Sequence, residues 1–303
     1  MGNPNWSEEQ IKDLHHAVVI ITGGNTGLGF EQAKVLARKG ATVVLAVRNT
    51  DRGHAAAQEI RNVYPNALVK AMKLDLSDLD SVRDFCSTFQ EKYKRLDILI
   101  NNAGVMVPPF SLTKDGFELQ FGVNHLGHYA LTGLLLPLIM QSEQARVVTI
   151  SSLANCWKGA NINFEDLQWN THYDKQRAYS QSKLANILFA YELDRRCKAK
   201  DVPILSLCAH PGWSVTNLQH NLNGIVKRIA HYLSQPPEMG ALPILRAATD
   251  PNVLGGEYFG PSGKNGRKGY PVQVTSSSLT HDRMLAERLW KVSEELTGVT
   301  YPV

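Results

Sequence analysis

Short apolar runs rich in β-branched residues alternate along this chain with longer segments of helical periodicity. Seven runs are predicted to be strands, at 17–24, 41–48, 68–76, 96–104, 145–152, 203–212 and 256–261. Between them lie segments such as 31–38, 81–93 and 183–196, with apolar residues about 3.6 positions apart. Near-continuous apolar strands need a cover on both faces of a sheet, and strand–helix alternation produces parallel βαβ units. We therefore predict a doubly wound α/β fold, with helices on both faces of a mostly parallel seven-stranded sheet.

The domain organisation follows from the same pattern. Residues 1–13 precede the first strand and are predicted to form an N-terminal extension. No repeat or linker divides residues 14–303, which are predicted to form one domain. Two stretches, 153–178 and 213–237, are longer than a strand-to-helix link needs, and such excursions are usually functional. We expect both to border the substrate, and apolar spacing predicts a short amphipathic helix over 225–233.

Composition and charge exclude several classes of function. The net charge of +4 is mild and no lysine–arginine block occurs, so we predict no nucleic-acid partner. No apolar run approaches the roughly 20 residues of a membrane span, so we predict no transmembrane segment. The four cysteines are scattered, without a Cys-x-x-Cys pair, which indicates reduced thiols and a cytoplasmic location. His125, His128 and His210 match no ligand spacing, so we predict no metal site.

A glycine-rich turn, "ITGGNTGLG", follows the first predicted strand directly and opens a helix. Gly23, Gly27 and Gly29 would allow a tight turn, bring backbone amides close to a pyrophosphate and let helix and strand pack closely. The helix N-terminus adds partial positive charge. A plain tight turn is the alternative, but the position between a buried strand and a helix favours a dinucleotide site.

The end of the second predicted strand bears on which dinucleotide binds. Arg48 stands where a site for the cofactor lacking the extra phosphate often has Asp or Glu, and Arg52 is nearby. A guanidinium can grip a 2′-phosphate, whereas a carboxylate would repel it. We therefore predict NADP(H) as the cofactor, with a solvated charge at a strand end as the alternative for Arg48.

The stretch "AYSQSKLAN" places Tyr179 four residues before Lys183, so both would lie on one face of a helix. Chance produces many such pairs, yet an ammonium fixed beside a phenol suits a phenol that exchanges a proton. Near the end of the fifth predicted strand, Ser151 and Ser152 are both candidates to bind a substrate oxygen. Side chains alternate along a strand, so only one of the two should face the site.

Several motifs occur together in a fixed order. They are Thr22-Gly23-x-x-x-Gly27-x-Gly29, "NNAG" at 101–104, Ser152, "YSQSK" at 179–183 and "PG" at 211–212. In this order they resemble the short-chain dehydrogenase/reductases, from about residue 15 to residue 300. The wording of "NTGLG", "NHLGHYALT" and "YSQSKLAN" most resembles the retinol-dehydrogenase-like branch, which is also similar to WW-domain oxidoreductases and light-dependent protochlorophyllide reductases.

The resemblance implies a Rossmann-type fold and specific roles for residues of this chain. It implies catalytic roles for Asn124, Ser152, Tyr179 and Lys183, and it selects Ser152 over Ser151. The implied cofactor-binding residues are Gly23, Asn25, Thr26, Gly27, Leu28, Gly29, Arg48, Asp75, Leu76, Asn102, Ala103, Gly104, Tyr179, Lys183, Pro211, Gly212 and Thr216. In the family the asparagine matched by Asn124 holds a water in a proton relay.

The predicted activity is NADP(H)-dependent interconversion of a carbonyl and an alcohol, with Tyr179 as general acid and base. The ammonium of Lys183, with an oxidised nicotinamide beside it, is expected to lower the pKa of Tyr179 toward the working pH. Trp157, Trp169 and Trp213 on the long loops suggest a hydrophobic substrate. The alternatives are a catalytically silent dinucleotide-binding sensor or scaffold, and a reductase of C=C bonds like protochlorophyllide reductase. Family resemblance also suggests a homodimer or homotetramer.

Overall fold

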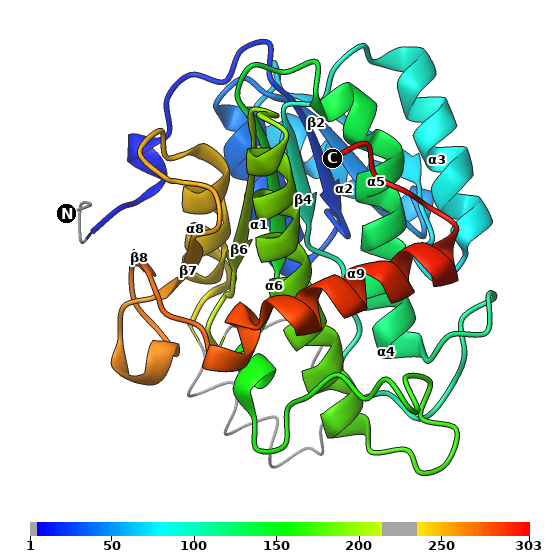
Figure 1. Ribbon diagram of the computed structural model, residues 1–303. Coiled ribbons are helices and arrows are strands. Elements are labelled where there is room, and N and C mark those ends of the chain that lie inside the picture. Colours follow the sequence, from blue (N-terminus) through cyan, green and yellow to red (C-terminus); the bar gives the residue numbers. More distant parts are fainter. Residues whose placement is uncertain (1–4, 214–234) are drawn as a thin grey trace.

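The computed structural model describes residues 5–213 and 235–303 as an α/β domain built on one mostly parallel sheet (Figure 1). The strand order is β3-β2-β1-β4-β5-β6-β7-β8. The seven predicted strands are confirmed as β1 (Val18–Thr22), β2 (Thr42–Val47), β3 (Leu68–Lys73), β4 (Ile98–Asn101), β5 (Ala145–Ile150), β6 (Ile204–Ala209) and β7 (Tyr258–Pro261). All of these pair in parallel.

The sheet has eight strands, so the predicted number of seven was one too few. The eighth, β8 (Pro271–Gln273), pairs antiparallel with β7 at the sheet edge. It has three residues and begins with proline, which donates no ladder hydrogen bond and is tolerated at edges. So short a run carries no recognisable alternation, and the sequence pattern therefore did not reveal it.

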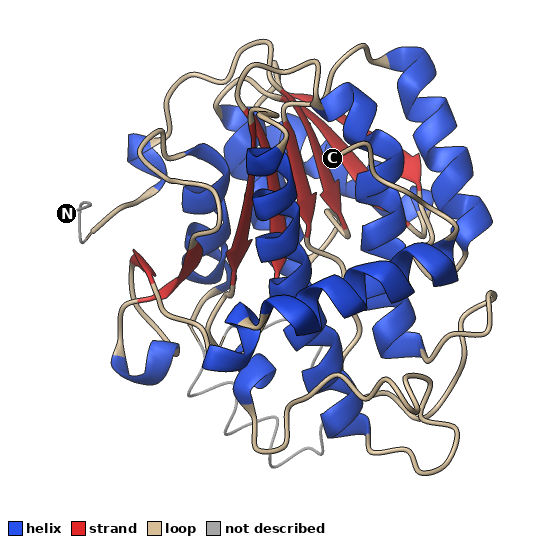
Figure 2. Cartoon of the chain, in the orientation of Figure 1, coloured by secondary structure: helices blue, strands red, loops and turns tan. Residues whose placement is uncertain are grey.

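Helices cover both faces of the sheet (Figure 2). The helices are α1 (Gly27–Arg38), α2 (Thr50–Val63), α3 (Leu79–Lys92), α4 (Leu119–Phe121), α5 (Gly127–Ile139), α6 (Lys175–Ala199), α8 (Pro237–Thr249) and α9 (Arg283–Thr297). Shorter turns are η1 (Glu8–Gln10), η2 (Gly122–Leu126), η3 (Leu153–Cys156), η5 (Lys264–Gly266) and η6 (Ser278–His281). Along β1, Val19 and Ile21 pack in the core beneath α1, α2 and α8, whereas Ile20 packs beneath α3, α5 and α6. This alternation explains why β1 is apolar throughout.

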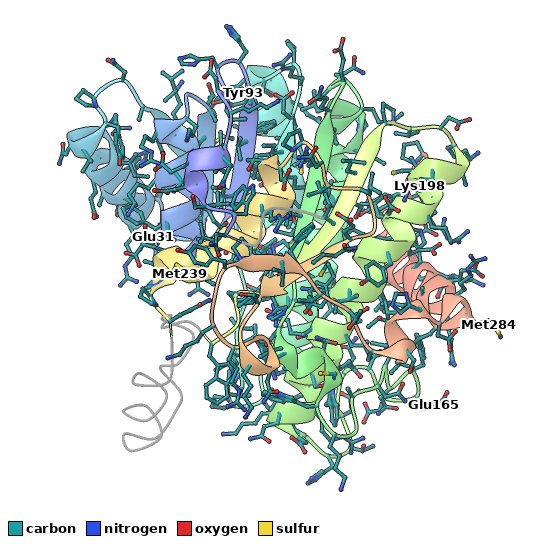
Figure 3. The ribbon with its side chains drawn as sticks, turned by 90° about the vertical axis from the view of Figure 1, so that its left-hand side faces the viewer. Glu31, Tyr93, Glu165, Lys198, Met239 and Met284 are labelled. Atoms are coloured by element: carbon teal, nitrogen blue, oxygen red, sulfur yellow. The ribbon has the colours of Figure 1, made fainter. Side chains whose placement is uncertain are left out.

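Helix α6 carries the Tyr179 and Lys183 pair and is nearly enclosed. Asp174 caps its N-terminus by accepting hydrogen bonds from the amides of Gln176 and Arg177. The helix packs against β5 and β6 on its inner side. Helix α9 crosses its outer side, and Figure 3 shows Met284 of α9 and Lys198 of α6 on one side of the molecule. A 25-residue helix buried in this way is a rigid support for a site.

The ends of the described chain are tied to the domain. Trp6 and Ile11 are buried in the same core as α1 and α8, so residues 5–13 pack on the domain. The predicted helix at 225–233, and most of the predicted loop at 213–237, lie outside the described residues. Within residues 5–213 and 235–303, no helix combines the length and apolar character that crossing a bilayer requires.

Candidate active site

The glycine turn joins the end of β1 to the start of α1. Gly23 and Gly27 have φ angles of +65° and +55°, in the left-handed region that favours glycine. A Cβ on Gly29 would lie 2.6 Å from the Gly23 carbonyl oxygen, so only glycine fits there without a backbone shift. The residues expected to hold a cofactor phosphate, including Asn25, Thr26 and Leu28, are therefore gathered in one compact turn.

The free end of this turn fits an anionic ligand. Thr26 stands at the N-cap position of α1 but makes no side-chain cap hydrogen bond, so its side chain satisfies none of the first helical amides. A Cβ on Gly27 would meet nothing within 4 Å, so the space in front of the turn is open. Unpaired amides and the positive end of the helix favour a phosphate group at this place.

The loop after β4 lies against the glycine turn. The backbone amides of Asn102 and Ala103 donate to the Thr22 hydroxyl over 2.9 and 2.8 Å, and Asn102 Nδ2 donates to the Thr22 carbonyl. A Cβ on Gly104 would lie 3.0 Å from Asn124 Oδ1 and 3.6 Å from Lys183 Nζ. This loop therefore connects the predicted cofactor residues to the predicted catalytic ones.

Arg48 and Asp75 follow β2 and β3, at the same edge of the sheet. Arg48 is exposed, and its carbonyl accepts a hydrogen bond from Lys73 Nζ, which puts a second positive charge close by. Asp75 is half-buried, with Oδ1 bonded to the amide and hydroxyl of Ser77. Leu76 is buried, so its side chain packs inside the domain.

The two serines after β5 face different ways. Ser151 is buried and donates its hydroxyl to the carbonyl of Lys183 over 2.7 Å. Ser152 is half-buried, accepts from the Ala154 amide and lies where its hydroxyl opposes the rise in the pKa of Tyr179. Of the two serines, Ser152 is therefore the one beside the Tyr179 phenol.

Tyr179 and Lys183 are buried neighbours, with 6% and 5% of their surfaces exposed. The ammonium nitrogen of Lys183 lies 5.8 Å from the centroid of the Tyr179 ring. It donates to the carbonyl of Ile150 over 3.2 Å. An ammonium has three donors, so Lys183 retains donor capacity for a further partner.

The pKa of Tyr179 does not move in the expected direction. Burial raises it to about 12, and the hydrogen bond from Ser152 opposes part of that rise. Burial also lowers the pKa of Lys183 to about 8. Both shifts disfavour the charged form, so desolvation outweighs the attraction between phenolate and ammonium within the chain itself. Lys183 alone therefore does not lower the pKa of Tyr179, and the predicted lowering by Lys183 together with an oxidised nicotinamide stays a prediction.

Asn124 lies in a π-helical turn, η2, between α4 and α5. Its Oδ1 accepts from the Val105 amide, and its Nδ2 donates to the Val105 carbonyl and to Ser182 Oγ. Both side-chain amide protons are thus used inside the protein. π-turns of this kind occur frequently at functional sites.

The turn after β6 holds Pro211 and Gly212. Gly212 has a φ of +64°, and its amide donates to His210 Nδ1. Gln235 Nε2 donates to the Pro211 carbonyl. Thr216, the remaining predicted cofactor residue, lies outside the described residues.

The sequence analysis missed Asn186, which shares the site's hydrogen bonds. Its Nδ2 donates over 2.9 Å to the Ile150 carbonyl, the acceptor that Lys183 also uses. The signal was present in "YSQSKLAN", because position i+3 from Lys183 lies on the same helix face. Thr22 stands in the glycine motif, but no role was predicted for its hydroxyl, because the partners of that hydroxyl come from distant segments.

The three loop tryptophans have different environments. Trp157 is exposed and lies 6.1 Å from the Tyr179 ring, centroid to centroid. Trp169 is buried, with the Arg177 guanidinium over its ring. Trp213 is exposed beneath Arg267. Of the three, only Trp157 contacts a predicted catalytic residue.

The three histidines are not gathered around a common point. His125 binds Ser293, His128 binds Thr22 and Asn124, and His210 binds Gly212. In residues 5–213 and 235–303, no group of three or more His, Cys, Asp or Glu side chains could hold a metal ion.

Comparison with known proteins places this site in a family. A family model described as short chain dehydrogenase matches residues 17–225. The chain is 42% identical to mouse retinol dehydrogenase 12, over 94% of this chain and 87% of the relative. The chain is a member of the short-chain dehydrogenase/reductase family. It is retinol-dehydrogenase-like and, as a member, is an oxidoreductase that uses a nicotinamide dinucleotide and acts on small molecules.

Two further matches show the breadth of this short-chain dehydrogenase branch. A chloroplastic protein of Brassica napus, short-chain dehydrogenase TIC 32 B, is 37% identical over 94% of this chain and 89% of its own length. The crystal structure of an uncharacterised protein from Mycobacterium paratuberculosis superposes with a TM-score of 0.82 at 41% identity. It covers 99% of this chain and 100% of its own.

A separate cavity of about 430 Å³ lies on the α1 and α8 side of the sheet, where Figure 3 places Glu31 and Met239 close together. Its walls carry paired charges, including Arg38 with Glu8. None of the predicted site residues line it, and Tyr179 is on α6 beneath the opposite face. The cavity is therefore not part of the dehydrogenase site.

Proposed function

We propose that this dehydrogenase interconverts a carbonyl and an alcohol on a hydrophobic small molecule, with NADP(H) as cofactor and Tyr179 as general acid and base. The observation that carries the proposal is the meeting of Ser152, the buried Tyr179–Lys183 pair and the loop after β4 at one place. When bound, the nicotinamide would supply the hydride and, in its oxidised form, a positive charge near the phenol.

In the direction of reduction, the residues share the work as follows. Ser152 donates to the substrate oxygen and stabilises the charge that develops there. Tyr179, kept protonated by a pKa near 12, gives its proton to that oxygen. The ammonium of Lys183 has donors left after its hydrogen bond to Ile150, and these would bind the ribose of the cofactor. Its positive charge would act on the neighbouring phenol. Asn124 uses its amide protons within the chain, so the water of the proton relay would bind its main-chain carbonyl, which also accepts from His128 Nδ1.

The preference for NADP(H) is supported by charge at one corner of the site. Arg48 is exposed at the end of β2 and Lys73 is bonded to its carbonyl, so a 2′-phosphate would meet two cations. The half-buried carboxylate of Asp75 would take the adenine amino group, while Asn102, Gly104, Pro211 and Gly212 would border the rest of the cofactor.

The substrate class is supported by the apolar surroundings of Tyr179. Val107 and Ala154 pack with it in one buried cluster that Met106 adjoins, and Trp157 lies over the open side. These residues favour a bulky apolar carbonyl compound. The name of the mouse relative is consistent with such a substrate but does not assign retinol to this chain.

The assay that tests the proposal compares Tyr179→Phe with wild type in NADPH oxidation by a panel of apolar aldehydes and ketones. We expect kcat/KM to fall by about 1,000-fold, because only the proton donor is lost. Tyr191→Phe is the matched control. It removes a phenol on the same helix whose hydroxyl binds Ser276, outside the site.

Two outcomes would reject the proposal. NADPH binding without turnover of any carbonyl would favour a sensor, and saturation of a C=C bond in the product would indicate the alternative reductase chemistry. Turnover with NADH equal to that with NADPH would reject the cofactor preference alone.

Location and assembly are proposed on narrower grounds. We propose the cytoplasm, since all four cysteines are unbridged and only Cys156 is exposed; fractionation of cells would test this. A homodimer or homotetramer also stays a prediction. Because α9 packs across α6, pairing through that helix would require α9 to take part, and light scattering would measure the assembly size.

A further inference from the structure

His128 is a buried histidine whose ring lies between the cofactor turn and the catalytic helix. It occupies the first turn of α5 and only 1% of its surface is exposed. Its Nε2 is 2.9 Å from the Thr22 hydroxyl, and its Nδ1 is 3.1 Å from the main-chain carbonyl of Asn124. The histidine thus bridges two segments that are about a hundred residues apart in the chain, each part of the site.

The partners determine where the ring proton lies. A carbonyl oxygen can only accept, so Nδ1 of His128 must carry the proton and donate to Asn124. Burial and the nearby Lys183 ammonium lower the pKa of His128 to about 4, so the ring is neutral and Nε2 is bare. The Thr22 hydroxyl must therefore donate its proton to Nε2.

This assignment also satisfies the Thr22 hydroxyl. Its oxygen accepts from the amides of Asn102 and Ala103, which uses both lone pairs, and its single proton goes to His128. The Ile100 carbonyl, at 3.4 Å, is a poorer acceptor for that proton. One directed chain of hydrogen bonds therefore runs from the loop after β4, through Thr22 and His128, to Asn124.

The Asn124 main-chain carbonyl is the group that this series of hydrogen bonds orients. The side chain of Asn124 is held by Val105 and Ser182, so His128 contacts Asn124 only through the main chain. In the proposed proton relay, the direction of this carbonyl would decide whether a water can bridge it to Lys183.

We propose that His128 is a positioning residue, which as a neutral Nδ1–H tautomer fixes the Asn124 carbonyl relative to the cofactor turn. This rests on the proposed function for its kinetic consequence, though not for its structural content. If the bridge breaks at His128, Thr22 still receives both amides and can donate to Ile100. The cofactor turn should then survive while the proton relay is misaligned.

His125 provides a matched control. It lies on the same helical segment, is equally buried, and binds Ser293 of α9 through Nε2. Its pKa is lowered by burial to about 3, so it too is neutral. Removing either ring takes one hydrogen bond from a buried hydroxyl, Thr22 or Ser293, but only His128 contacts the glycine turn.

The first test measures the tautomer without any reaction. Ring ¹⁵N chemical shifts at neutral pH, with the His128 signals identified by their absence from His128→Asn, should show a protonated Nδ1 and a bare Nε2. This is the less common neutral tautomer of histidine in water. A protonated Nε2, or a charged ring at neutral pH, would overturn the bridge.

The second test separates positioning from support of the fold. For His128→Phe we expect kcat to fall by about 10- to 100-fold while the Kd for NADPH changes by about threefold or less. His128→Asn, which keeps a donor near the Nδ1 position, should recover most of kcat. His125→Phe should keep kcat within about twofold of wild type, at a similar loss of thermal stability.

The outcomes distinguish the two proposals. Unchanged kcat in His128→Phe, or an NADPH affinity that falls as far as kcat, would overturn the positioning role. If wild type turns over no carbonyl, the proposed function fails, and the ¹⁵N measurement still decides whether the bridge exists. Should His128→Phe not fold, the kcat of His128→Thr, which loses the reach of the ring, takes its place in the comparison.

Discussion

The cofactor side of the site and the loop on its substrate side are held together by different kinds of contact. On the cofactor side, side chains donate hydrogen bonds to backbone carbonyls that are distant in the chain: Asn102 to Thr22, and Lys183 to Ile150. In the loop after η3, Asp166 accepts from the backbone amides of Asn170 and Thr171, within five residues of itself. The loop also has contacts that are distant in the chain, since Gln181 of α6 accepts from the Asn163 amide and the Tyr173 hydroxyl accepts from Gln120 Nε2.

The difference indicates which of the two parts can change in sequence without disturbing the other. A change on the cofactor side disturbs two or three segments at once, because each hydrogen bond joins elements far apart in the chain. A change at an exposed residue of the loop, such as Trp157, disturbs mainly the loop, so substrate choice can alter while the positions of Tyr179 and Lys183 are kept. Four predictions test this contrast.

The substitution of Lys183 has the largest expected effect, because burial of its ammonium destabilises the folded protein. Its folded pKa of about 8 lies below the unfolded value of 10.5, so the unfolded chain binds more protons between these two pH values. This loss of folding stability is fully present below pH 8 and disappears as the pH rises to 10.5. Lys183→Met should therefore be more stable than wild type by roughly 3 kcal/mol at pH 7, with the difference vanishing near pH 10.5.

Chemical denaturation at several pH values would measure this difference. Lys158→Met, at an exposed lysine of the loop, is the control and should show no pH-dependent gain. A constant difference across the whole pH range would mean that Lys183 is not desolvated in the folded protein.

A substitution of Arg48 tests the predicted contact with the 2′-phosphate at the edge of the cofactor side. Arg48→Glu should lower the preference for NADPH over NADH by about 100-fold, since a carboxylate would repel the 2′-phosphate. Steady-state kinetics with both cofactors would measure the ratio. The same charge reversal at exposed Arg283, at the start of α9, should leave it unchanged, and equal responses of the two variants would refute a local phosphate contact.

Gly27 tests whether a phosphate occupies the open space before α1. Gly27→Ala and Gly116→Ala each add a Cβ at a positive φ with nothing within 4 Å, so both should lose about 1 kcal/mol of stability. Only Gly27→Ala should weaken NADPH binding, by about 30-fold, because its methyl group would meet the pyrophosphate. Fluorescence titration would measure the affinities, and identical binding would place the cofactor elsewhere.

Trp157 gives the smallest effect and lies in the loop half. Trp157→Ala should raise KM for bulky apolar carbonyls by about fivefold, with kcat and NADPH affinity nearly unchanged. A small aldehyde serves as the internal control, since it would not reach the indole. A loss of kcat comparable to that of Tyr179→Phe would show that the loop and the cofactor side do not vary independently.

Much of the fold was predictable because it depends on local patterns. The seven parallel strands follow from apolar runs, and the glycine turn follows from residues within eight positions of one another. β8 was not predictable, because its three residues gain their strand conformation only from pairing with β7.

The sequence predicted which residues come together but not the environment of the phenol. The spacing of Tyr179 and Lys183 correctly indicated two neighbours on one helix face, but it did not reveal how strongly burial raises the pKa of Tyr179. Burial by Trp157, Ala154 and other side chains from distant segments decides that pKa, and no local pattern reveals it. The bridge between Thr22 and His128 likewise joins residues whose proximity depends on the whole sheet.

Helix α9 and the residues after it have a consequence for how the chain is made. The Tyr301 hydroxyl donates to the Tyr129 carbonyl, and the rings of Trp290 and Tyr301 pack against Tyr129. A nascent chain that has already produced α5 and α6 would therefore expose an apolar flank until residues 283–301 have left the ribosome.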